Sequence, residues 1–179
     1  DETVDGFGAF SAEGAEADPD AAPIVSSRSI RSPAFWDVLG HEGLRVGLVN
    51  IPLTYPPRPV NGFMVTGLLT PPTAPVFTYP PELSAQLPDH VVEIDRFAGR
   101  IPFVDVIDGA IVEPSLELIG DFRAMLDRRA AEAHALQAGQ AWDVFMTVFM
   151  ETDRLGHYLW AFHHAPPAGD PHAAALHAA

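Results

Sequence analysis

The sequence contains no cysteine, few basic residues and no long apolar run. Without cysteine the chain can form neither a disulfide nor a thiolate ligand, so a bound metal would have to be held by histidine and carboxylate groups. Lysine and arginine number 10, against 24 aspartate and glutamate residues. This imbalance argues against a nucleic-acid groove, which needs a basic surface. No apolar run approaches the roughly 20 residues that a membrane-spanning helix requires.

The 179 residues suit one domain, and 47% of them are hydrophobic, as in a globular protein. Residues 1–27 are poor in bulky apolar side chains and are predicted to be loop or mobile. Residues 28–162 have a globular pattern, and the Ala- and Pro-rich tail over 163–179 is predicted to end in loop. The N-terminus has no signal-peptide features, which favours a cytoplasmic location. The sequence does not fix an oligomeric state.

The segment from Trp142 to Trp160, WDVFMTVFMETDRLGHYLW, carries the clearest structural signal. Its first part, residues 142–150, is short, apolar and rich in β-branched and aromatic residues, which predicts a strand buried on both faces at the centre of a sheet. Apolar residues then recur at helical spacing, and Thr152 or Asp153 could cap the start of that helix. Asp153 should therefore lie at the carboxyl end of a central strand, where open α/β sheets place ligand-binding residues.

Asp153 and His157 form the candidate metal-binding pair. Their spacing brings both onto one face of a helix, and a carboxylate with an imidazole is half of a ligand set for a first-row transition metal. The same spacing occurs at Asp37 and His41, but no strand precedes it, and there we expect an ordinary solvated helix face. The predicted strand in front of Asp153 favours the metal interpretation for the second pair.

Two further groups of residues have both a functional and a plain interpretation. Glu151 could act as a general base beside a metal, but a charged residue at a strand end is the interpretation that we favour. The tail histidines could bind metal, although exposed side chains are more frequent in such a composition; they are His163, His164 and His172. The sequence has no G-x-S-x-G, P-loop or G-x-G-x-x-G motif, so acyl-hydrolase, phosphate-loop and dinucleotide-binding functions lack support.

Weaker signals place the other elements. They are a helix from Pro33 to Gly40 or Gly43, a strand over 44–51, a short strand over 63–65, a short helix over 82–87 and a helix over 115–138. Two apolar runs between residues 91 and 114 suggest one or two more strands. Helices that alternate with strands through brief connections are typical of a largely parallel α/β sheet.

A family resemblance rests on three segments: SPAFWDVLGHEGLRVGLVNIPLTYPPRPVNGFMVTGLLTPP, TYPPEL and WDVFMTVFMETDRLGHYLW. Together, over about residues 28–162, they resemble the type I phosphodiesterase/nucleotide pyrophosphatase branch of the alkaline phosphatase superfamily. The resemblance implies an α/β fold with an alkaline-phosphatase-like mixed sheet flanked by helices, incomplete in this chain. It also implies two divalent metal ions, commonly zinc, with Asp153 and His157 as ligands of one of them. Because a metal-bound imidazole must be neutral, metal should be lost below about pH 6.5.

The implied activity is metal-dependent hydrolysis of a phosphodiester, nucleotide or other small phosphoester. The family pattern also needs an early Asp, a Ser or Thr nucleophile, a later Asp-His pair and a final His. None of these motifs can be placed here, so the sequence suggests an internal fragment, inactive alone, whose nucleophile lies outside this chain. Two alternatives remain: a non-catalytic binding module of the same fold, and a related metal-dependent phosphomutase or sulfatase.

Overall fold

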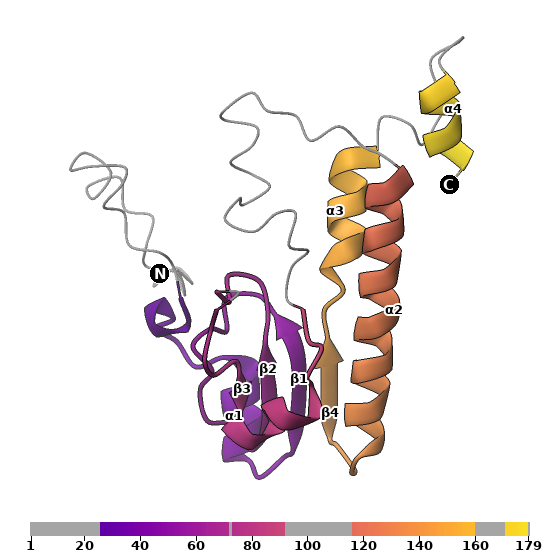
Figure 1. The fold of residues 1–179 in the computed structure, drawn as a ribbon. Helices are drawn as coiled ribbons and strands as arrows, with labels where there is room; N and C mark the ends of the chain where they lie inside the picture. Colours follow the sequence, from indigo (N-terminus) through magenta and orange to yellow (C-terminus); the bar gives the residue numbers. More distant parts are fainter. Residues whose placement is uncertain (1–25, 72, 92–115, 160–170, 179) are drawn as a thin grey trace, which may run out of the picture. The chain divides into compact units, whose positions relative to one another are not determined.

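The computed structural model describes residues 26–71, 73–91, 116–159 and 171–178 (Figure 1). The chain divides into two compact units. The first comprises residues 1–92 and 135–148, and the second comprises residues 93–134 and 149–179. The apolar runs predicted between residues 91 and 114 lie almost entirely outside the described residues, as does most of the segment 1–27.

The first unit contains a mixed sheet with the strand order β3-β2-β1-β4 (Figure 1). Its strands are β1 (Val46–Ile51), β2 (Gly62–Thr66), β3 (Thr78–Tyr79) and β4 (Val144–Thr147). β1 pairs in parallel with both β2 and β4, whereas β3 runs antiparallel to β2. The predicted strands over 44–51 and 63–65 are therefore confirmed, and the three parallel strands end at the same edge of the sheet.

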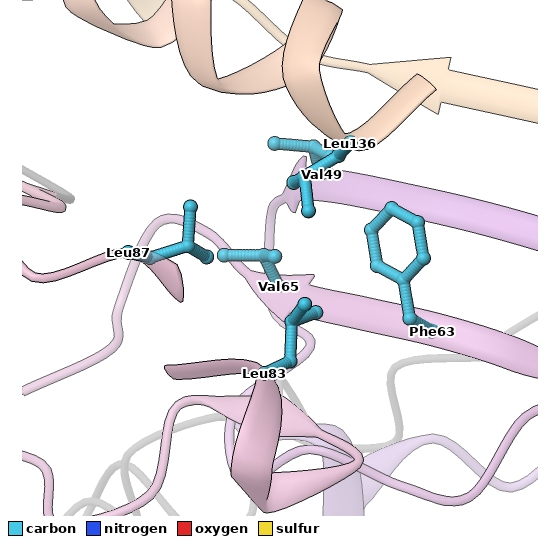
Figure 2. Close-up of a cluster of buried hydrophobic side chains, with 6 residues drawn as sticks. All are labelled: Val49, Phe63, Val65, Leu83, Leu87 and Leu136. Atoms are coloured by element: carbon cyan, nitrogen blue, oxygen red, sulfur yellow. The ribbon is translucent and has the colours of Figure 1, made fainter. Parts of the chain in front are cut away.

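Apolar side chains cover both faces of this sheet. Alternate residues of a strand point to opposite faces, so Val49 belongs to one cluster and Leu48 to the other. The first cluster, shown in Figure 2, contains Val49, Phe63, Val65, Leu83, Leu87 and Leu136. On the other face Val46, Leu48, Ile51 and Met64 pack against side chains that include Trp36 and Leu39. The sheet is thus flanked by helical segments, as the sequence predicted.

Helix α1 (Phe35–His41) starts later than its Ser-Pro signal predicted. The carboxylate of Asp37 accepts a hydrogen bond from the backbone N–H of Ala34 at 2.9 Å, which fixes the first turn at Phe35. At the other end Gly43 has a φ of +81°, and the N–H of Leu44 donates to the carbonyl of Leu39 at 3.0 Å. This is the left-handed glycine termination that leads the chain directly into β1.

Short 3₁₀ helices occupy Ser27–Ser29 (η2) and Pro81–Gln86 (η3), the second of them close to the predicted helix over 82–87. Helix α2 (Leu116–Ala138) agrees with its prediction to within one residue. Helix α3 spans Met150–Leu159, and α4 spans Pro171–Ala178. The expectation of loop in the tail is wrong for 171–178, where the many alanines, the best helix formers, outweigh the lack of an apolar face. No helix in the described residues is long and apolar enough to cross a membrane.

Strand β4 differs from the prediction in length, burial and position. It covers Val144–Thr147 instead of 142–150, its residues are half-buried or exposed, and β1 is its one neighbour in the described sheet. The N–H of Val148 still donates to Val49, but Met150 already belongs to α3. The apolar run is therefore shared between a helix and a strand at the end of the described sheet, which an apolar pattern alone does not distinguish.

Candidate functional site

Asp153 and His157 both lie within α3, and neither residue caps the start of the helix. The helix begins at Met150, so Asp153 is already in its first turn and the predicted cap at Thr152 or Asp153 is wrong. The Thr152 hydroxyl instead donates to the carbonyl of Phe149 at 3.0 Å. Asp153 is exposed, and position 157 follows it by about one helical turn, so the backbone places both positions on one face.

Glu151 is the residue of α3 whose surroundings were least expected. Its side chain is 0% exposed, and its carboxylate lies 2.6 Å from the guanidinium of Arg129 on α2, which is 2% exposed. α2 and α3 run side by side in Figure 1, in agreement with this contact. Glu151 is therefore a member of a buried ion pair, and the interpretation as a charged residue at a strand end is incorrect.

Arg129 interrupts an otherwise apolar stripe on α2. Phe122, Met125, Ala133 and Leu136 are buried at helical spacing, and Arg129 is buried in the middle of that spacing. Of the apolar face predicted for this helix, Leu116 is 52% exposed instead. The sequence does contain a signal that could have identified Arg129: it is a charged residue at a position where the helical period calls for an apolar one.

A second group of polar residues lies at the carboxyl ends of the parallel strands. Asn50 is 1% exposed and has a φ of +59°, and the β1–β2 register shifts at this residue. Neither side-chain amide atom of Asn50 has a hydrogen-bond partner among the described residues, and the same is true of the buried Thr147 hydroxyl at the end of β4. Buried polar groups without partners and left-handed non-glycine residues are rare, and both are more frequent at functional sites.

Neighbouring threonines at the same edge are fully bonded. The hydroxyl of Thr54 donates to the carbonyl of Ile51 at 2.6 Å, and that of Thr66 donates to the carbonyl of Phe77 at 3.0 Å. The Thr70 hydroxyl lies 2.9 Å from that of Thr66. Internal hydrogen bonding is therefore the rule for buried threonines here, and Thr147 departs from it.

The second D-x-x-x-H pair, Asp37 and His41, lies in α1 beside a surface hollow of about 300 Å³. Besides its bond to Ala34, the Asp37 carboxylate forms an ion pair with Arg58 at 2.7 Å. This carboxylate has a local structural role in the helix start. The expected ordinary helix face at this pair thus also carries an ion pair, between Asp37 and Arg58.

The described residues contain no cluster of three or more histidine, aspartate or glutamate side chains that could hold a metal. Asp153 and His157 are thus half of a ligand set at most within this part of the chain. His163 and His164 lie outside the described residues, and His172 is the second residue of α4.

A family model described as type I phosphodiesterase / nucleotide pyrophosphatase matches residues 9–177. This match covers nearly the whole chain and agrees with the family that the sequence resembles. No match was found among curated proteins or among solved structures.

Proposed function

The chain belongs to the type I phosphodiesterase / nucleotide pyrophosphatase family, and we propose that its function is the metal-dependent hydrolysis of phosphoric esters. The observation that carries the metal part of the proposal is the T-D-x-x-x-H segment, whose Asp153 and His157 occupy one face of α3. A phosphodiester or a nucleotide is the substrate class that fits the family.

The donor chemistry of these two positions fits a zinc ion. Carboxylate and imidazole are both zinc ligands, and the absence of cysteine leaves them as the available donor types. An exposed Asp153 in the first turn of α3 can reach a ligand from solvent. The remaining ligands would come from residues beyond this pair.

Each residue would have a distinct task in the reaction. Two divalent cations, when bound, would stabilise charge on the phosphoryl oxygens and make hydroxyl and water better nucleophiles at neutral pH. Asp153 would contribute negative charge and His157 a neutral nitrogen donor, and neither would transfer a proton. By the family resemblance the attacking group would be a Ser or Thr hydroxyl.

The proposal is tested by removing each donor in the complete protein. Asp153→Asn and His157→Gln should each lower zinc content by about one ion per molecule, and should lower the rate of hydrolysis of bis(4-nitrophenyl) phosphate by at least about a hundredfold. His41→Gln is the matched control, because it makes the same change in the other D-x-x-x-H segment. Wild-type zinc content in both α3 variants would refute the assignment.

A further inference from the structure

The ion pair between Arg129 and Glu151 stabilises the contact of α2 with α3 no better than apolar packing would. Both side chains are almost fully buried, with a nitrogen-to-oxygen distance of 2.6 Å. Removing two charges from water is so costly that a buried pair is often no better for stability than two well-packed apolar residues. Arg129 also lies in the buried stripe of α2, one turn from Met125 and one turn from Ala133, where the helical period places apolar side chains.

A buried ion pair does specify geometry. Apolar contacts between helices tolerate small rotations and slides, whereas a carboxylate and a guanidinium buried together must meet at hydrogen-bond distance or leave charges uncompensated. The pair therefore selects one rotation and one axial position of the first turn of α3. Arg154, also buried, lies on the same side of α3 as Glu151, because three positions separate them.

The positions of the two candidate ligands follow from the position of Glu151. At about 100° and 1.5 Å per residue, position 153 lies roughly 200° around the helix from position 151, and position 157 roughly 240°. The face that carries Asp153 and His157 is thus opposite the face that carries Glu151. This agrees with the burial of Glu151 and the exposure of Asp153.

We propose that Arg129 and Glu151 are positioning residues, whose ion pair fixes the rotation of α3 and so holds Asp153 and His157 in the geometry that a metal ion requires. The inference rests on the proposed function. A rotation of α3 by about 20° would move an atom 6 Å from the helix axis by roughly 2 Å, whereas metal–ligand distances tolerate about 0.2 Å. Without the ion pair the helix can still form, but its ligand face is no longer fixed.

The test uses the complete protein loaded with zinc or with cobalt(II), whose visible absorption reports ligand geometry. Glu151→Gln keeps the shape of the side chain and removes its charge. We expect it to weaken zinc binding about tenfold or more, measured by competition with a chelator, and to change the cobalt spectrum. Glu42→Gln is the matched control, because Glu42 is exposed after α1, and it should change neither.

A second variant separates positioning from stability. Arg129→Met combined with Glu151→Leu fills the same space without charge, and we expect its thermal midpoint to equal or exceed that of the wild type. Its zinc affinity should stay low and its cobalt spectrum should stay altered. Recovery of both properties along with the midpoint would overturn the inference, as would wild-type zinc affinity in Glu151→Gln.

Asp153→Asn distinguishes failure of this inference from failure of the proposed function. If Asp153→Asn loses zinc while both Glu151 variants bind it normally, the metal site stands and the positioning role is wrong. If Asp153→Asn also binds zinc normally, the proposed function itself fails.

Discussion

Replacing Thr147 by valine should not destabilise the protein, whereas the same replacement at Thr66 should. Valine is nearly isosteric with threonine, so each change removes one hydroxyl and preserves the packing volume. The Thr66 side chain is buried and its hydroxyl donates to Phe77 at 3.0 Å and lies 2.9 Å from the Thr70 hydroxyl. The Thr147 hydroxyl is also buried, but it has no partner among the described residues.

The magnitudes follow from these contacts. In Thr66→Val the Phe77 carbonyl still accepts from the backbone N–H of Thr66, and the Thr70 hydroxyl still donates to the carbonyl of Gly67. Losing a hydrogen bond whose partners keep other bonds costs about 1 kcal/mol, whereas removing an unpaired buried hydroxyl is neutral or favourable. The free energy of unfolding should therefore fall by about 1 kcal/mol in Thr66→Val and should stay equal or rise slightly in Thr147→Val. For a chain of this size the first change lowers the thermal midpoint by about 2–4 °C.

Urea denaturation of the two variants beside the wild type measures the difference directly. The m-values should stay equal, because neither variant changes the surface exposed on unfolding. If Thr147→Val lost as much stability as Thr66→Val, the Thr147 hydroxyl would have to be hydrogen-bonded in solution. The conclusion that the carboxyl end of β4 carries an unpaired polar group would then be wrong.

Three further predictions test the strand edge, the helix α2 and the metal pair. Asn50→Gly should be more stable than Asn50→Ala by about 1 kcal/mol in urea denaturation, because both remove the unpaired amide but only glycine accepts the φ of +59° without strain. Gly67→Ala should strongly reduce the folded fraction seen by circular dichroism, because the new Cβ would lie 2.3 Å from the carbonyl oxygen of Asn50. Gly120→Ala is the contrasting change: the Cβ meets open space, and the variant should stabilise α2 by about 1 kcal/mol. Zinc content at constant free zinc should fall between pH 8 and pH 5, because imidazole binds a metal in its neutral form and a free histidine has a pKa of about 6.5; constant occupancy over that range would contradict His157 as a ligand.

The sequence was sufficient to predict the elements whose signals are local. The period of apolar residues predicts α2 almost to its ends, and the apolar run before Pro52 predicts β1. Residues 142–150 were harder, because a short apolar run is compatible with a buried strand, an edge strand or the first turn of a helix. Which of these forms depends on contacts with distant segments of the folded chain. In the described sheet the run pairs with β1 on one side.

The polar features of the fold depend on contacts between distant segments. Nothing local to Glu151 distinguishes a solvated carboxylate from a buried one, because its partner Arg129 comes from another helix. The left-handed conformation of Asn50 likewise results from the irregular pairing of β1 with β2, not from the residues beside it. These residues break the rules of apolar periodicity and hydrogen-bond satisfaction, and such breaks are expected where function outweighs stability.

The two D-x-x-x-H segments show why spacing alone cannot identify a metal site. In α1 the carboxylate of Asp37 bonds the first turn of its own helix and pairs with Arg58. In α3 the neighbouring carboxylate of Glu151 makes the buried contact with Arg129 of α2. The two segments therefore share a spacing but not their surroundings, and the zinc contents of Asp153→Asn and His41→Gln, not the motif, decide which of them binds metal.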